Sequence, residues 1–255
     1  MKTGIAKLDE ILGEIRSGEL ILVAGRIGMG KTTLFGQIIA NNCMEKKCAY
    51  LSALEDNFGI CAQVECALGN MTLAEYIKKE KTKEVEEVCK ATQEIISKKL
   101  NEGLYFYFGK KRFLDVCIQL AKLKAEKGLD FVCLDNFELM EKNIPMPVLA
   151  QGLKLLAEEL DIVIFAGCCP KRTGNIPNYY AISVNEHLKY YADKIIAVHR
   201  KEVFATIKDF EEKRFKKGES LLCVSKNNGG ETGVATVYFN YQRCGFFDSP
   251  IQNDE

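Results

Sequence analysis

The residues best suited to chemistry in this sequence form a glycine-rich run that ends in a lysine and a threonine. The run is Gly25-x-x-x-x-Gly30-Lys31-Thr32, and it lies between an apolar stretch at 19–24 and a helical pattern. Glycines let the backbone turn its amide groups, together with the positive N-terminus of a helix, toward phosphate oxygens. The lysine adds a positive charge, and the threonine hydroxyl can ligate magnesium. A strand, this loop and a helix in that order are the context that a P-loop requires.

The sequence therefore predicts a site for ATP and Mg²⁺ in this loop. The residues expected to bind the nucleotide there are Gly25, Arg26, Gly28, Met29, Gly30, Lys31, Thr32 and Thr33.

Two carboxylates lie where a magnesium nucleotide would need them. Asp135 follows four apolar residues, so we expect it at the carboxyl end of a parallel strand, where it would serve the metal together with Thr32. Glu55 follows the apolar segment 48–54 and can orient and deprotonate the attacking water, and the adjacent Asp56 is a competing candidate. The expected catalytic residues are thus Glu55 and the P-loop lysine, Lys31.

The elements that must position these residues alternate along the chain. Short apolar runs rich in β-branched and aromatic residues predict strands near 19–24, 48–54, 130–135, 162–167, 195–199, 221–226 and 234–240. Helical patterns cover 31–44, 58–68, two charged segments within 72–101, 113–127 and 147–160. The glycine-rich segment 227–233 predicts a hairpin at one sheet edge. The predicted fold class is α/β, with a mostly parallel twisted sheet, helices on both faces and a C-terminal β-hairpin.

Length and charge limit the classes of function. A chain of 255 residues can form one large domain, which we place at 1–247, and the polar tail 248–255 is expected to fray. Lys plus Arg and Asp plus Glu both number 35, so the net charge favours neither nucleic acid nor a membrane as partner. Any polyanion would have to meet a local patch.

The cysteines and the apolar runs point to a reduced compartment. Eleven cysteines occur without any C-x-x-C spacing, which favours reduced core thiols over a disulfide framework or a zinc site. No apolar run approaches the roughly 18 residues of a membrane span, and the N-terminus lacks the apolar segment of a signal peptide. We therefore expect a cytoplasmic protein with no membrane partner.

Several segments resemble the C-terminal ATPase domain of DnaB-type replicative DNA helicases. In order along nearly the whole chain they are Thr3-Gly4-Ile5-x-x-Leu8-Asp9, 18–26, 29–32, 51–55, 128–140 and 232–239. The KaiC and RadA groups share the opening motif and the P-loop, and the ordered set favours DnaB. The resemblance implies a RecA-like fold that assembles as a homo-hexameric ring, hydrolyses ATP at subunit boundaries and draws single-stranded DNA through its centre.

The resemblance also implies roles for single residues. The phosphate, magnesium, catalytic base and Walker B positions of the family fall on residues already named: Lys31, Thr32, Glu55 and Asp135. Two residues join the nucleotide site by resemblance alone. Lys226 matches the lysine of the family's Lys-x-Arg piston, and Arg200 matches an arginine near the nucleotide.

Departures from the family pattern affect the expected rate. Asn228 stands two positions after Lys226, where the family carries an arginine finger. Such a finger is worth roughly 10³ to 10⁵ in turnover, so its loss predicts slow hydrolysis. The segment Gly167-Cys168-Cys169 lacks the glutamine with which the family senses the γ-phosphate, and a thiol is a weak replacement because it hydrogen-bonds poorly.

The expected DNA and subunit contacts are also reduced. One central loop keeps Lys171 and Arg172, and its Tyr179 and Tyr180 could either stack on bases or pack within the loop. The match begins at Thr3, without the family's N-terminal domain and linker helix, so the resemblance predicts weak hexamer formation.

Three functional hypotheses stay open. The first is a DnaB-like ATPase that works on single-stranded DNA in replication, favoured by the intact P-loop, Glu55 and Asp135. The second is a degenerate nucleotide-binding module that associates with a replication partner or a helicase ring, favoured by Asn228. The third is a KaiC- or RadA-like ATPase with the same nucleotide chemistry.

Overall fold

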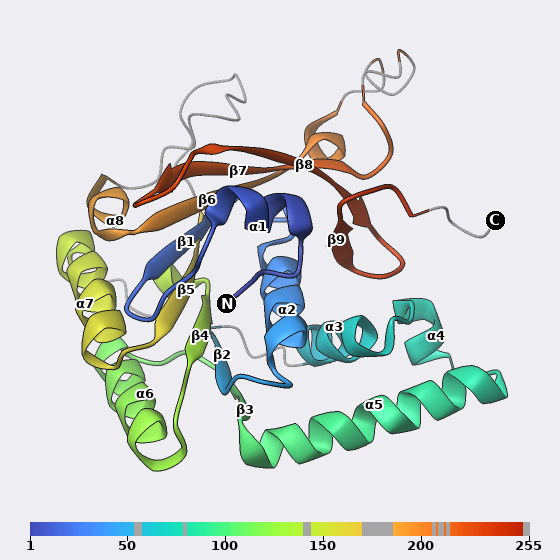
Figure 1. The fold of residues 1–255 in the computed structure, drawn as a ribbon, viewed down its shortest axis with the longest axis horizontal. Helices are drawn as coiled ribbons and strands as arrows, with labels where there is room; N and C mark the ends of the chain where they lie inside the picture. Colours follow the sequence, from blue (N-terminus) through green and yellow to red (C-terminus); the bar gives the residue numbers. More distant parts are fainter. Residues whose placement is uncertain are drawn as a thin grey trace.

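The computed structural model describes residues 1–53, 58–78, 81–139, 144–169, 186–205, 208, 212 and 215–251. Within these residues the strands form one nine-stranded sheet in the order β3-β2-β4-β5-β1-β6-β7-β8-β9 (Figure 1). Neighbouring strands from β3 through β6 are parallel, whereas β7, β8 and β9 extend the sheet in antiparallel fashion. The predicted α/β class with a mostly parallel sheet is confirmed.

The parallel strands, in chain order, are β1 Leu20–Ala24, β2 Cys48–Ser52, β3 Leu104–Phe108, β4 Phe131–Asp135, β5 Val163–Cys168 and β6 Lys194–Arg200. The antiparallel strands are β7 Glu219–Asn227, β8 Gly233–Asn240 and β9 Gly245–Phe247. The helices are α1 Ala6–Leu12, α2 Lys31–Asn42, α3 Phe58–Gly69, α4 Leu73–Ile77, α5 Lys83–Glu102, α6 Phe113–Lys127, α7 Met146–Glu159 and α8 Glu186–Tyr191, with 3₁₀ turns at Phe137–Leu139 and Lys201–Phe204.

Helices cover both faces of the sheet because alternate residues of a buried strand point to opposite sides. In β1, Ile21 and Val23 join the apolar cluster formed with α1 and α2, whereas Leu20 and Leu22 join the cluster formed with α6 and α7. Every residue of β1 is buried. This explains why the strand appears in the sequence as an unbroken apolar run rather than an alternating one.

The structure adds elements that the sequence patterns did not predict. These are the strands β3 and β9 and the helices α1 and α8. The hairpin predicted across 227–233 does form between β7 and β8, but its predicted position at the sheet edge was wrong, because β9 pairs with the outer side of β8. The three C-terminal strands therefore continue the sheet past the last parallel strand, β6.

The N-terminal helix is fastened to the start of the C-terminal tail. The Asp248 carboxylate accepts hydrogen bonds of 2.9 Å from the backbone amides of Ala6 and Lys7, in the first turn of α1. The Lys7 ammonium donates in return to the Asp248 carbonyl at 2.6 Å. The fraying expected for the tail therefore does not include its first residue.

All eleven cysteines belong to the described residues and are free thiols, but the predicted core location holds for only seven of them, since three are partly buried and Cys169 is exposed. Across that part of the chain, no three His, Cys, Asp or Glu side chains are grouped so that they could hold a metal ion. None of the helices in the described ranges has both the length and the apolar character needed to cross a bilayer.

Candidate nucleotide site

The P-loop leaves the carboxyl end of β1 and leads directly into α2. Gly30 precedes the helix in the left-handed conformation, with a φ of 93°, and an added Cβ there would stand 2.8 Å from the Phe246 ring. Gly28 also has a positive φ, 81°, but an added Cβ would meet nothing within 4 Å. The loop thus requires glycine for its backbone at both positions, while its outer side stays open for a ligand.

Lys31 lies at the centre of this loop and is 7% exposed. Its ammonium donates to the carbonyls of Gly25 at 2.7 Å and of Arg26 at 3.3 Å. These carbonyls hold the charge inside the curve of the loop, at the N-terminus of α2. A phosphate placed there would meet both the ammonium and the positive end of the helix.

Some of the other residues in and next to the loop are buried, and others are exposed to solvent. Met29 is buried, and its sulfur accepts a hydrogen bond of 3.2 Å from the backbone amide of Arg200. Thr33 is buried on α2, whereas Arg26 is half-buried. Ile27 is 88% exposed at the tip of the loop.

The predicted magnesium residues meet directly. The Thr32 hydroxyl donates to Asp135 Oδ2 at 2.6 Å, and the Tyr50 hydroxyl donates to the same oxygen at 2.9 Å. Asp135 is 2% exposed, and its second oxygen, Oδ1, is buried with no hydrogen-bond partner in the described part of the chain. Gly167 on the adjacent strand lies beside Oδ1, where an added Cβ would come within 3.1 Å.

This arrangement fits Mg²⁺. A hydroxyl and a carboxylate are oxygen ligands of the kind that this ion prefers, and it usually keeps several waters and binds through one or two protein groups plus phosphates. The unpartnered Oδ1 of Asp135 is an acceptor that a metal-bound water could satisfy. Thr32 and Asp135 would therefore hold the metal, which would neutralise phosphate charge beside Lys31.

Arg200, predicted from resemblance alone, lies next to the P-loop. Its guanidinium donates to the Gly28 carbonyl at 3.2 Å and to Glu202 at 2.9 Å. The same group lies over two aromatic rings, 3.8 Å from the centre of Phe239 and 4.6 Å from that of Tyr241. Arg200 is only 7% exposed, so this cation–π stack is a buried contact that ties the end of β6 to the end of β8 beside the P-loop. Sequence reasoning missed both aromatic residues.

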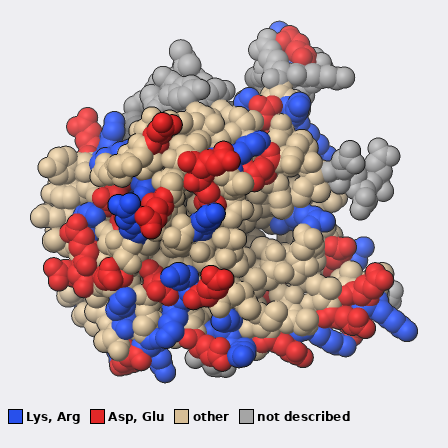
Figure 2. Space-filling view, viewed as in Figure 1, with Lys and Arg blue, Asp and Glu red and all other residues tan. Residues whose placement is uncertain are grey.

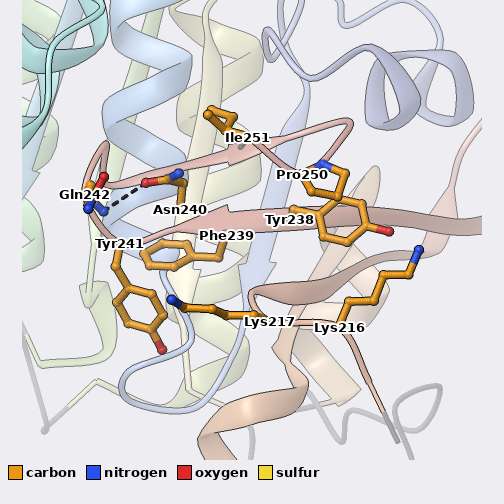
Figure 3. Close-up of a pocket in the computed structure, with 9 residues that line it drawn as sticks. All are labelled: Lys216, Lys217, Tyr238, Phe239, Asn240, Tyr241, Gln242, Pro250 and Ile251. Atoms are coloured by element: carbon orange, nitrogen blue, oxygen red, sulfur yellow. Dashed lines mark hydrogen bonds between the residues drawn. The ribbon is translucent and has the colours of Figure 1, made fainter. Parts of the chain in front are cut away.

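A pocket of about 560 Å³ adjoins this stack (Figure 3). Its lining combines aromatic, amide and lysine side chains: Lys216, Lys217, Tyr238, Phe239, Asn240, Tyr241, Gln242, Pro250 and Ile251. Phe239 connects the pocket to the P-loop, because its ring stands 3.6 Å from where a Cβ on Gly30 would be. The pocket is therefore placed beside the phosphate loop rather than at a separate end of the molecule.

The carboxylate of Glu138, which also lies beside the P-loop, was not predicted from the sequence. Glu138 lies on the 3₁₀ turn after β4 and accepts a hydrogen bond of 3.1 Å from the Cys169 backbone amide. Burial raises its pKa, although the amide and the nearby Lys31 charge act in the opposite direction. It links the ends of β4 and β5 next to the P-loop. The signal available in the sequence was an acid three positions after Asp135.

Lys226 and Asn228 lie at the end of the strands opposite to the P-loop. β7 runs antiparallel to β6, and Lys226 pairs with Ile195 at the start of that strand, whereas the P-loop lies near its end. The Lys226 ammonium donates to the last carbonyls of α8 and its cap: those of Lys189 at 3.1 Å, Tyr190 at 3.2 Å and Ala192 at 2.5 Å. Neither residue is brought to the P-loop of its own chain.

The remaining predicted residues lie outside the described ranges. They are the catalytic candidates Glu55 and Asp56 and the central-loop residues Lys171, Arg172, Tyr179 and Tyr180.

Fold and loop together define the class: a RecA-like α/β protein with a P-loop nucleotide site. The family model described as DnaB-like helicase C terminal domain matches residues 1–248. The chain belongs to that family.

Curated relatives and solved structures agree with this assignment. The replicative DNA helicase DnaB of Helicobacter pylori is 24% identical over 307 residues, which cover 98% of this chain and 60% of the relative. That of Geobacillus stearothermophilus is 24% identical over 254 residues, 93% of this chain and 54% of the relative. The chain thus spans little more than half the length of these relatives.

Two solved structures share the fold. One, described as an ATPase domain, superposes with a TM-score of 0.79 at 18% identity, and the match covers 97% of this chain and 90% of that one. The other, a DnaB-like replicative helicase described with its interactions with primase, gives a TM-score of 0.79 at 18% identity and covers 96% and 61%.

Proposed function

We propose that this protein binds ATP with Mg²⁺ and hydrolyses it, as the motor domain of a DnaB-like helicase. The observation that carries the proposal is the group formed by Lys31, Thr32 and Asp135. A buried ammonium, a helix N-terminus and a buried carboxylate that is bonded to the P-loop threonine converge on one open loop. These are the parts needed to bind and orient a magnesium triphosphate.

The base of the nucleotide would occupy the pocket beside Phe239. Two features support this placement: the pocket adjoins the P-loop through that ring, and the buried Arg200 guanidinium stacks on the same ring and so fixes its position. Lys216 and Lys217 add positive charge to the lining of this pocket. The triphosphate would then extend from the pocket across Gly30 toward Lys31.

Turnover would depend on Glu55 as the base for the attacking water. Bound metal supplies charge neutralisation for the leaving phosphates, and the chain's own groups bind and orient the nucleotide. The position that would carry an arginine finger holds Asn228, whose backbone amide donates to the Asp193 carbonyl at 2.9 Å. The Asn228 side chain lacks the positive charge with which an arginine finger stabilises phosphate charge in a neighbouring subunit, so we expect hydrolysis to be slow.

Action on single-stranded DNA would require a ring. Figure 2 shows lysine and arginine side chains interspersed with acidic ones over the face in view, without a continuous basic tract. The net charge of zero agrees with this pattern. The face in view therefore offers no basic tract to DNA, and we expect DNA affinity to come from loops brought together around the central channel of a homo-hexamer.

A second candidate function is a nucleotide-binding module that joins a helicase ring or a replication partner without being a motor. Asn228 favours it, because a chain without the finger could occupy a ring position and bind nucleotide while contributing little to turnover next door.

The test is an ATPase assay with and without single-stranded DNA on protein whose oligomeric state is measured by light scattering. A DNA-stimulated rate on a hexamer supports the motor, and an unstimulated slow rate on a monomer supports the module. Glu55→Gln should keep triphosphate binding and stop turnover in either case. Folded protein that takes up no triphosphate in calorimetry would rule out both functions.

A further inference from the structure

Tyr50 is a fully buried phenol that contacts the expected magnesium residue from a different strand. In the pairing of β2 with β4, Ser52 lies opposite Asp135 and Tyr50 lies opposite Cys133. Residues two apart on a strand share a face, so Tyr50 is the diagonal neighbour of Asp135 on the side of the sheet that α2 covers. Its hydroxyl reaches Asp135 Oδ2 at 2.9 Å.

The two oxygens of Asp135 differ in their surroundings. Oδ2 accepts two O–H donors, from Tyr50 at 2.9 Å and from Thr32 at 2.6 Å. Oδ1 is equally buried and accepts none from the described residues. Two donors on one oxygen fix the rotation of the carboxylate and leave the other oxygen as the available acceptor. Gly167, which has no side chain, and the apolar Phe35 ring lie on this side of Asp135, so neither offers Oδ1 a side-chain hydrogen bond.

The Tyr50 ring itself is held firmly. It is 2% exposed and packs against Phe106 and Phe108 of β3, with ring centres 6.2 Å and 6.0 Å away. A rigid donor on a neighbouring strand can hold the carboxylate whether or not the P-loop moves.

We infer that Tyr50 is a positioning residue for the divalent metal of the nucleotide site: it fixes Asp135 through Oδ2 and so presents Oδ1 to the hydration shell of the ion. Thr32 alone could not do this, because its hydroxyl must also offer its oxygen to the metal and lies in the first turn of α2, directly after the loop that would meet the nucleotide. Tyr50 provides an anchor that makes no contact with ligand. The inference rests on the proposed magnesium nucleotide site and goes beyond it.

The experiment compares Tyr50→Phe with Tyr105→Phe in the full chain. Tyr105 on β3 is a matched control, since its hydroxyl is also buried but has no partner among the described residues. Mn²⁺ affinity of the protein–ADP complex is measured by electron paramagnetic resonance, and nucleotide affinity in EDTA is measured with a fluorescent analogue. Thermal unfolding of each variant reports the folded fraction.

Loss of a partner that orients a metal-binding carboxylate typically costs about 10-fold or more in metal affinity. We therefore expect Tyr50→Phe to weaken Mn²⁺ binding about tenfold, with nucleotide affinity in EDTA unchanged and Tyr105→Phe like the parent on both measures. Mn²⁺ affinity within twofold of the parent would overturn the inference. So would an equal loss of nucleotide affinity in EDTA or a failure to fold, since either would show a general structural role. If the parent protein itself binds no metal nucleotide, the proposed function fails instead.

Discussion

Buried charged residues lie at both ends of the parallel strands. The two ends differ in whether all the hydrogen bonds of these residues are made within the protein. At the carboxyl end, Lys31 is held by loop carbonyls, and Asp135 keeps one buried oxygen without a partner in the described residues. At the amino end, Lys194 pairs with Glu19 and Lys154 pairs with Asp193, each at 2.7 Å. Both ends bury charge, but only the amino end is complete without a ligand.

The difference separates groups that bind from groups that support. A buried charge is tolerated when its hydrogen bonds are made within the protein. A buried charged group that lacks a hydrogen-bond partner is destabilising unless a ligand provides the partner. The amino end therefore acts as a structural clamp between β1, β6 and α7, while the carboxyl end keeps the unpartnered oxygen that the proposed magnesium site would use. By this criterion Lys226, whose ammonium is occupied by three carbonyls, belongs to the clamp in the isolated chain.

The largest effect is expected from breaking the clamp at Lys194. Lys194→Met leaves the Glu19 carboxylate buried without its partner, and the side chains of this pair are only 3% and 15% exposed. Loss of one partner of a buried pair costs about 3–5 kcal/mol, which urea unfolding should detect. Lys90→Met is the control, because it breaks an exposed pair with Glu86 and should leave the unfolding curve unchanged. Nucleotide affinity of folded Lys194→Met should equal that of the parent, and a large loss would show that the two ends are not independent.

The next largest effect is expected from Lys31, at the carboxyl end of the strands. Lys31→Ala removes the ammonium from the loop, and we expect triphosphate affinity to fall by about 100-fold, near 2.7 kcal/mol, in calorimetry. Lys47→Ala is the matched control, since that lysine also donates to a carbonyl, of Lys127, far from the loop. A small effect of Lys31→Ala on triphosphate affinity would mean that the helix N-terminus alone accounts for binding.

Sequence patterns predicted the carboxyl end of the strands, with its P-loop, better than the clamp at the amino end, for a physical reason. The P-loop is local: its glycines, lysine and threonine act through a backbone shape made by consecutive residues. The strands beside it are buried on both faces, so they stand out as apolar runs. The helix α1 was missed because its seven residues include Lys7, Asp9 and Glu10, and the bonds that fasten it come from Asp248, at the other end of the chain.

Contacts that depend on strand register were beyond local patterns. The bond from Tyr50 to Asp135 joins residues 85 positions apart, and it needs the pairing of β2 with β4. The stack of Arg200 on Phe239 spans the strand β7 that lies between β6 and β8. Lys226 is a different case: an antiparallel strand following β6 had to carry its end away from the P-loop, so its position could have been predicted from the hairpin.

A smaller effect is expected from Lys226. Lys226→Met leaves the last carbonyls of α8 without their hydrogen-bond donor. A hydrogen bond from a charged donor stabilises a protein by about 1.5–3 kcal/mol. Because the Lys226 side chain is partly exposed, we expect the free energy of unfolding to fall by an amount near the lower figure. Triphosphate affinity of the isolated chain should not change, because the residue lies at the far end of β6. A tenfold or greater loss of affinity on a monomer would contradict this placement, whereas a loss of turnover confined to assembled rings would assign Lys226 to a neighbouring site.

The smallest effect concerns His199, near the carboxyl end of β6. Burial, followed by the charges of Lys201 and Arg26, lowers the pKa of His199 to about 4. The unfolded chain, with an ordinary value near 6.5, takes up the proton first, so stability is present above about pH 6.5 and is lost as the pH falls toward 4. We expect unfolding free energy in urea to fall by about 1 kcal/mol between pH 6.5 and pH 5, a window chosen above the carboxylate range. His199→Asn should flatten that slope, and an equal slope in the variant would assign the pH dependence to other groups.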